Sequence, residues 1–262
     1  MLRRALESDA DAVVADLEDA VASAAKAAAR ELVRDVLGAR ARESGGPLVL
    51  VRPNGAGTAF FADDLDAVSA LAPDAIVLPK AVPQTLDALG SEGPPVTAIV
   101  ETAHGVRHAY DVASAPRVAA LLLGAVDLGA EIGLESRPDG LEILYARSKV
   151  VLESAAAGVR PPFDIVHLDV DDDEGLEAEC RLARSLGFRG KACIHPAQVP
   201  IVNRVFAPSE ADIEWARKVI EAYEQAESEG RGVLALNGAM VDLPVVERAR
   251  RILAEAEREV TR

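Results

Sequence analysis

Short apolar runs alternate along this chain with longer segments of helical periodicity, and this alternation constrains the fold more than any other feature. Most of the runs are rich in Val, Ile and Leu without polar alternation, which is typical of strands buried on both faces. We predict strands at Ala12–Asp16, Leu48–Arg52, Ala75–Pro79, Thr97–Glu101, Val118–Gly124, Ile165–Val170 and Lys191–His195. We predict helices at Ala20–Leu37, Asp63–Leu71, Pro83–Leu89, Gly105–Ala113, Leu141–Gly158 and Gly175–Leu186. A strand followed repeatedly by a helix predicts parallel βαβ units.

The number of these repeats favours an α/β fold of the closed TIM (β/α)8 type over an open sheet. The predicted strands are one short of the eight that such a barrel has. Leu2–Glu7 has the pattern of a helix that would follow an earlier strand. We therefore expect a barrel that lacks its first strand or is truncated there.

The pattern changes after His195. Glu210–Ser228 and Leu243–Glu259 are predicted to be long charged helices, joined by the small, apolar stretch Gly232–Asp242. We predict a TIM-type barrel over residues 1–206 and a C-terminal helical appendage over residues 207–262.

Charge and composition exclude several classes of partner. Lys and Arg number 28 against 43 Asp and Glu, which gives a formal net charge of −15, and aromatic residues make up 3% of the chain. Such a chain repels a phosphate backbone and offers few stacking platforms, so we expect no nucleic-acid partner. We expect no membrane span, because no apolar run reaches about 18 residues, and the charged start does not resemble a signal peptide. Cys180 and Cys193 are too few for a disulfide framework, so we expect a cytoplasmic protein.

Charged or metal-binding residues end almost every predicted strand. In a barrel of parallel strands these ends lie at the face that carries the chemistry. The residues at or just beyond the strand ends are Asp16, Glu18, Asp19, Arg52, Lys80, Glu101, Asp127, Asp169, Asp171 and His195. A rim of this kind favours a shared site over isolated solubilising residues.

Glu101 and Asp127 close two consecutive predicted strands, so both carboxylates can point into one mouth. Two carboxylates close together repel each other unless a positive charge lies between them. Mg²⁺ suits such a pair, since it is held by one or two carboxylates, water and the substrate's oxygens. The alternative is that each acid caps the following helix.

Arg52 and Lys80 are the basic residues of this rim. Arg52 is followed by Pro53, and its guanidinium can grip a substrate carboxylate; the alternative is an ion pair with Glu18 or Asp19. For Lys80 an ion pair is favoured over a Schiff base.

Eight segments occur in an order that resembles a known family. They are VVADLEDAV, VLVRPNG, IVLPK, AIVETAHGV, LLLGAVDLGAEIG, DGLEILYARSKVVLESAAAG, LGFRGKACIHPAQV and NGAMVDLPVVERA. Together they resemble the HpcH/HpaI aldolase/citrate lyase β-subunit family, in particular its CitE-like CoA-ester lyases, over essentially the whole chain.

The resemblance implies a TIM barrel that binds Mg²⁺ and makes or breaks a C–C bond beside an acyl thioester. It places the metal ligands on Glu101 and Asp127, with Glu101 also beside the substrate, and it makes Arg52 a catalytic, substrate-binding arginine. The C-terminal Gly-x-Met-x-Asp-x-Pro motif places a catalytic acid/base on Asp242. In relatives this segment lies over a neighbouring subunit's barrel, usually in a trimer, so the resemblance implies a homo-oligomer.

The sequence departs from the family pattern in two places. Relatives begin with a strand and an Arg-Ser-x-Leu-x-x-Pro type of segment that does not appear here, which leads us to expect either a truncated start or a barrel closed in another way. The usual Lys or Gln before the motif's methionine is Ala239, which is expected to alter contacts to the acyl-CoA.

The predicted function is a Mg²⁺-dependent lyase. It would cleave or form a β-hydroxyacyl-CoA such as malyl-CoA or citramalyl-CoA, with acetyl-CoA and an α-keto acid or glyoxylate as the other species. Three alternatives stay open: a CoA-independent pyruvate-type aldolase, a citrate lyase β-subunit acting on an acyl-carrier thioester, and a non-catalytic scaffold.

Overall fold

The computed structural model describes residues 2–40 and 46–260, and the chain divides into two compact units, Met1–Val202 and Asn203–Arg262. The first unit alternates helices and strands from α1 to α9. Its strands are β1 (Ala12–Asp16), β2 (Leu48–Arg52), β3 (Ala75–Leu78), β4 (Val96–Val100), β5 (Val118–Leu123) and β6 (Arg160–Phe163). Its helices are α1 (Leu2–Leu6), α2 (Lys26–Arg40), α3 (Phe61–Leu71), α4 (Pro83–Leu89), α5 (Ala103–Arg107), α6 (Ala109–Ala113), α7 (Ala125–Ile132), α8 (Leu144–Ala157) and α9 (Asp173–Leu186), with 3-10 turns at Ser23–Ala25, Leu141–Ile143 and Pro196–Gln198.

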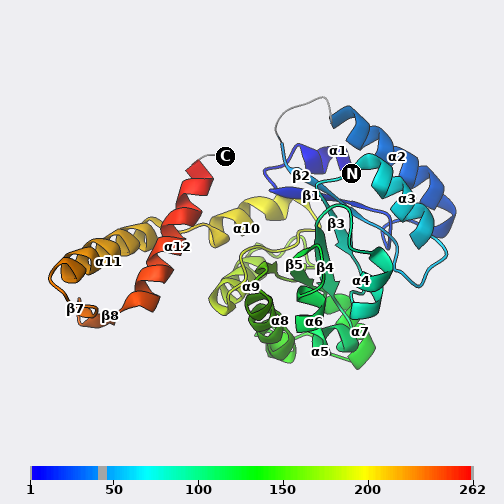
Figure 1. The fold of residues 1–262 in the computed structure, drawn as a ribbon. Helices are drawn as coiled ribbons and strands as arrows, with labels where there is room; N and C mark the ends of the chain where they lie inside the picture. The colour runs from blue at the N-terminus through cyan, green and yellow to red at the C-terminus, as the bar shows by residue number, and fades with distance from the viewer. Residues whose placement is uncertain (1, 41–45, 261–262) are drawn as a thin grey trace. The chain divides into compact units, whose positions relative to one another are not determined.

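The described strands of this unit form one parallel sheet in the order β1-β2-β3-β4-β5-β6, with each strand paired to its sequence neighbours (Figure 1). The registers align the carboxyl ends of β1 and β2, so that Asp16 lies opposite Arg52. This arrangement confirms the predicted parallel α/β fold. Within the described ranges the hydrogen-bonded ladder runs from β1 to β6, and closure into a full barrel stays a prediction.

The strands are apolar on both faces, as the absence of polar alternation predicted. On the face covered by helices, Val49, Ile76 and Val96 pack in the two large cores. On the opposite face, Leu50, Val77 and Ile99 form a smaller cluster. Helices therefore cover one face of the parallel ladder while aliphatic side chains line the other, a layering compatible with an α/β barrel.

Most predicted elements agree with the structure within a few residues. The predicted helix at Gly105–Ala113 is divided at His108 into α5 and α6. Helix α7 and helix α10 (Val199–Phe206) were not predicted, because both are short and follow strand-like apolar runs directly.

Two strand predictions were wrong. Residues 165–170 form no strand; β6 pairs with β5 instead, because helix α8 ends at the left-handed Gly158 and the chain enters the sheet two residues later. Leu168 and Val170 are exposed, so the apolar pattern of this run does not report burial. In Lys191–His195 only Lys191 is bridged, to Asp164.

A buried charge network lies directly beyond β6, where the regular ladder ends. Asp164 is fully buried and accepts hydrogen bonds from Arg147 Nε at 2.9 Å and Lys191 Nζ at 3.0 Å. Glu179 pairs with the same two cations, at 2.8 Å from Arg147 Nη2 and 2.8 Å from Lys191 Nζ. The balance of two acids and two bases allows charges to be buried where a strand would place aliphatic side chains.

The second unit is a helical pair with a hairpin between its helices. Helices α11 (Glu210–Ser228) and α12 (Leu243–Val260) pack together, with Ala216, Val219 and Val246 in their core. The stretch predicted as an apolar linker is an antiparallel hairpin of β7 (Leu234–Leu236) and β8 (Ala239–Val241). Asn237 and Gly238 form its turn with φ of 53° and 80°, the left-handed conformation that an Asn-Gly pair provides in a two-residue turn. Helix α10 carries the chain from one unit into the other.

Within the described part of the chain, no helix combines the length and the apolar character needed to cross a membrane.

The charge network leads to a stability prediction. Asp164→Asn leaves Arg147 and Lys191 buried with one carboxylate between them, and we expect it to lower the free energy of unfolding of the first unit by about 3–5 kcal/mol. Asp139→Asn breaks the exposed ion pair with Arg137 and should leave the free energy of unfolding nearly unchanged. Urea titration followed by circular dichroism measures both. Equal losses in the two variants would contradict the assignment of Asp164 as the centre of the network.

Candidate active site

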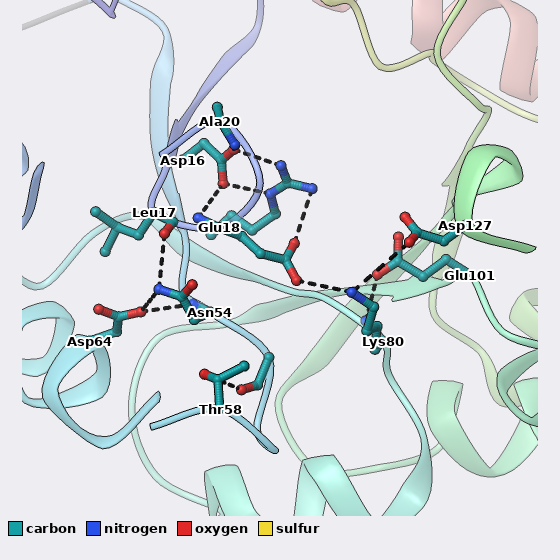
Figure 2. Close-up of polar contacts among 12 residues, drawn as sticks. Asp16, Leu17, Glu18, Ala20, Asn54, Thr58, Asp64, Lys80, Glu101 and Asp127 are labelled. Carbon is teal, nitrogen blue, oxygen red and sulfur yellow. Dashed lines mark hydrogen bonds and ion pairs between the residues drawn. The ribbon is translucent and has the colours of Figure 1, made fainter. Parts of the chain in front are cut away.

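The polar residues predicted to form a shared site gather at the carboxyl edge of the sheet where they follow β1 to β5, whereas Asp169 and Asp171 follow a run that forms no strand and His195 precedes a 3-10 turn. Asp16 and Arg52 end β1 and β2, and Glu101 directly follows β4. Lys80 lies two residues after β3, and Asp127 lies in the first turn of α7 after β5. Parallel topology brings these side chains together, because every strand ends at the same edge (Figure 2).

Arg52 is held rigidly at one side of this cluster. Its Nε and Nη2 donate to the two carboxylate oxygens of Asp16 at 2.7 and 2.6 Å, and its Nη1 lies 3.3 Å from Glu18 Oε2. Burial by itself raises the pKa of Asp16, but the hydrogen bonds and charge of Arg52 outweigh it, so the Asp16 pKa lies below its usual value. The structure confirms the ion pair with Glu18 considered from the sequence and adds the two-point pair with Asp16. Asp16 thus binds both Nε and Nη2 of Arg52, and Nη1 is the nitrogen that lies toward Glu18 and the rest of the cluster.

Lys80 links the two sides of the cluster. Its ammonium lies 3.5 Å from Glu18 Oε1 and 4.0 Å from Asp127 Oδ1, which confirms the ion-pair interpretation of this lysine (Figure 2). Its backbone is left-handed, with φ of 50°, and its main-chain N–H donates to Glu101 Oε1 at 2.7 Å. Lys80 therefore contacts one acid with its main chain and two with its side chain.

Glu101 is the most strongly perturbed acid of the site. It is only 4% exposed. Burial raises its pKa to about 7, and the charges of Asp127 and Glu18 add to this effect against the Lys80 hydrogen bond. Gly124 makes room for its side chain, since a Cβ at that position would lie 2.4 Å from Glu101 Cβ. The glycine after β5 was not predicted as a site residue, because its approach to Glu101 is a tertiary contact.

The helix-capping alternative does not hold for either acid. Thr102, not Glu101, caps α5 by accepting from Gly105 N. The residue that begins α7 is Gly124, and no side chain caps it. In Figure 2 the Asp127 and Glu101 side chains lie next to each other beside Lys80.

A shell of buried polar residues, missed in the sequence analysis, supports the loop that carries Glu18. Asn54 Nδ2 donates to Leu17 O at 2.9 Å and to the fully buried Asp64 at 2.5 Å. Lys26 Nζ donates to Leu17 O and Glu18 O, both at 2.7 Å. These contacts fix the backbone on which Glu18 faces Arg52 and Lys80. The polar Asn54 after an apolar strand was the available signal.

The donor set fits a divalent cation of the Mg²⁺ type. Glu18, Glu101 and Asp127 outnumber the single ammonium between them, and burial, with the charges of Asp127 and Glu18 adding to it, raises the pKa of Glu101. In the described ranges, no group of three or more His, Cys, Asp or Glu side chains is arranged around a common metal position. Two carboxylates completed by water and substrate oxygens form the kind of shell that Mg²⁺ accepts.

Asp242 lies in the second unit, between β8 and α12. It is half-buried, its Oδ1 accepts from Val245 N at 3.4 Å, and its carbonyl oxygen accepts from Val246 N at 3.1 Å. Asp242 therefore lies at the start of α12, and its carboxylate accepts from the first turn of that helix. Its predicted catalytic role stays a prediction.

The raised pKa of Glu101 predicts a pH dependence of stability. Because the folded-state pKa of about 7 exceeds the usual 4.5, metal-free protein should lose stability as pH rises from about 4.5 to 7, and the full penalty should persist above pH 7. Glu101→Gln removes this penalty while its amide oxygen still accepts from Lys80 N.

We expect Glu101→Gln to gain on the order of 2 kcal/mol in EDTA at pH 8 and to gain almost nothing near pH 4.5. The exposed Glu135→Gln serves as the control and should differ little from wild type at either pH. Chemical denaturation at the two pH values measures the effect. A Glu101→Gln variant that is no more stable than wild type at pH 8 would contradict the cost that we assign to burying the Glu101 charge beside Asp127 and Glu18.

Comparison with known proteins agrees with this geometry. Residues 1–196 match the family described as HpcH/HpaI aldolase/citrate lyase. A (3S)-malyl-CoA thioesterase of Cereibacter sphaeroides is 39% identical over 259 residues, which cover 98% of this chain and 90% of the relative. Citrate lyase subunit beta of Leuconostoc mesenteroides subsp. cremoris is also 39% identical, over 93% of this chain and 85% of the relative.

A solved structure is similar over nearly the whole chain. Protein CitE from Mycobacterium tuberculosis, crystallised with magnesium, acetoacetate and coenzyme A, superposes with a TM-score of 0.80 at 38% identity. The match covers 94% of this chain and 90% of that one. With its parallel strands ending in an acidic, arginine-flanked cluster, and with this degree of similarity, the chain belongs to the HpcH/HpaI aldolase/citrate lyase family.

Proposed function

We propose that this protein is a Mg²⁺-dependent carbon–carbon lyase acting on a β-hydroxyacyl-CoA. Its substrate is of the malyl-CoA or citramalyl-CoA type, and its products are acetyl-CoA and an α-keto acid or glyoxylate. The observation that carries the proposal is the buried Glu101 beside Asp127 at the carboxyl edge of the sheet. The CitE complex with magnesium, acetoacetate and coenzyme A supports the choice of metal and thioester.

Glu101 and Asp127 would hold the metal ion. When bound there, Mg²⁺ supplies Lewis acidity to the carboxylate and neighbouring hydroxyl oxygen of the substrate. Glu101 is oriented for this role by the Lys80 main-chain N–H and by the space at Gly124. Because the carboxylates lie in a partly dehydrated cluster, a cation there is bound more strongly than at an exposed pair.

Arg52 stabilises negative charge on the oxygen that becomes the keto carbonyl. Its Nε and Nη2 are fixed by Asp16, and Nη1, which lies 3.3 Å from Glu18 Oε2, is the nitrogen that we assign to the substrate oxygen. A donor that is already oriented costs little reorganisation as charge develops, and such a contact is commonly worth about 3 kcal/mol in the transition state. Asp16 is then the positioning residue for Arg52.

Asp242 moves the proton at the thioester carbon. In cleavage the substrate hydroxyl loses its proton as the C–C bond breaks, the Asp242 carboxyl donates a proton to the methylene carbon of the departing enolate, and the proton released by the hydroxyl restores the carboxyl. In synthesis the Asp242 carboxylate removes a proton from the methyl group of acetyl-CoA, and the new hydroxyl oxygen takes up a proton. The apolar side chains around it support a role at a subunit boundary, since Met240 is 68% and Leu243 49% exposed. We propose that residues 207–262 form the C-terminal appendage, that it covers a neighbouring subunit's barrel in a homotrimer, and that residues 1–206 close as a TIM-type barrel.

Both cysteines are free thiols, which supports a reducing, cytoplasmic location.

A second candidate function is hydrolysis of the thioester, because a relative with 39% identity is named a malyl-CoA thioesterase. The two reactions release different products. Hydrolysis liberates the free thiol of coenzyme A, whereas C–C cleavage liberates a keto acid and keeps the thioester intact.

The test is an assay on a panel of malyl-, methylmalyl- and citramalyl-CoA, with Mg²⁺ or with EDTA. Keto acid is trapped as its phenylhydrazone, and free thiol is measured in parallel. We expect keto acid without stoichiometric thiol, and loss of turnover in EDTA and in Asp127→Asn. Thiol release without keto acid would replace the lyase by the thioesterase, and full activity in EDTA would contradict a metal-dependent reaction.

Mixing two inactive variants tests the role of Asp242. Asp242→Asn should bind Mg²⁺ as wild type does and lose at least 100-fold in turnover. If its carboxylate serves a neighbouring subunit, co-refolding Asp242→Asn with Glu101→Gln should restore activity, since some sites then receive both intact residues. Absence of restored activity in mixed oligomers would contradict action between subunits.

A further inference from the structure

Lys80 holds the acidic cluster together in two ways that depend on different atoms. The main chain of Lys80 has a left-handed conformation after β3, and its N–H donates a 2.7 Å hydrogen bond to Glu101 Oε1. Its ammonium contacts Glu18 and Asp127, which come from the ends of β1 and β5. The side chain can therefore move without disturbing Glu101.

The two cations of the site differ in how firmly they are held. Arg52 is 22% exposed and makes a two-point hydrogen-bonded pair at 2.6–2.7 Å. The Lys80 side chain is 46% exposed, and its distances of 3.5 and 4.0 Å are those of loose ion pairs. Loose pairs of a half-exposed lysine are easily exchanged for solvent.

The charges facing Lys80 are in excess over it. Glu18 Oε1 and Asp127 Oδ1 lie 3.5 and 4.0 Å from the ammonium, and the Glu101 carboxylate lies beside Asp127. The ammonium thus neutralises part of the charge that a divalent cation would neutralise. Two cations cannot share Asp127 at close range without repelling each other.

We propose that Lys80 is the internal counter-ion of this site, that its ammonium competes with the divalent cation for Asp127, and that it thereby sets the metal affinity. This inference rests on the proposed function, because it takes Glu101 and Asp127 as the metal ligands. In metal-free protein the ammonium screens the acids from one another. When the cation binds, the ammonium moves away from Asp127 while the main-chain N–H keeps Glu101 in place.

The test measures Mg²⁺ binding itself, by isothermal titration calorimetry at pH 8.5 without substrate. Lys80→Met keeps the length of the side chain and removes its charge, and we expect the Kd for Mg²⁺ to fall about fivefold to tenfold. Lys80→Arg keeps the charge and should stay within twofold of wild type. Lys218→Met removes one positive charge from an exposed pair on α11 and should leave the Kd unchanged.

Thermal unfolding gives a second readout. Lys80→Met should lower the Tm in EDTA, since the acids lose their counter-ion, and should increase the rise in Tm that Mg²⁺ produces. An unchanged or weaker Mg²⁺ affinity in Lys80→Met, with wild type binding Mg²⁺ normally, would overturn the counter-ion role and leave the proposed function standing. Wild-type protein that binds no Mg²⁺ would overturn both.

Discussion

Repulsion between carboxylates at the carboxyl edge of a parallel sheet is the constraint on which the site depends. The topology forces Asp16, Glu101 and Asp127 to one edge, where each strand ends. Asp16 and Glu18 both contact Arg52, but Glu101 and Asp127 lie beside one loosely held lysine. The protein tolerates this excess because a bound cation relieves it, so that the same repulsion that destabilises the empty cluster favours metal binding.

The sequence predicted the part of the fold that follows from periodicity. Apolar runs gave β1 to β5 almost residue for residue, and their polar ends identified Arg52, Lys80, Glu101 and Asp127 as members of one cluster. This works because strands that follow one another in the sequence are also neighbours in the parallel sheet, so their carboxyl ends lie side by side at one edge. The main-chain roles were not predictable in this way: the φ of Lys80 and the space at Gly124 depend on tertiary contacts.

Predictions failed where buried charge replaced apolar packing. The strand expected at residues 165–170 is displaced by β6, whose proline-rich sequence gives a weak strand signal. The network around Asp164 joins residues far apart in sequence, and no local pattern reveals it. The hairpin at Asn237–Gly238 carried a clear turn signal, but its three-residue strands are too short for periodicity to detect.

Anomalous diffraction from crystals soaked with Mn²⁺ and an α-keto acid tests the central claim most directly. Manganese prefers the same carboxylate and carbonyl oxygens as Mg²⁺ and is located by its own scattering. We expect one strong anomalous peak within coordination distance of a Glu101 oxygen and an Asp127 oxygen, with the keto acid completing the shell on the side of Arg52. A peak coordinated by other residues, or none at this cluster, would contradict the assignment of the carboxyl edge as the metal-dependent active site.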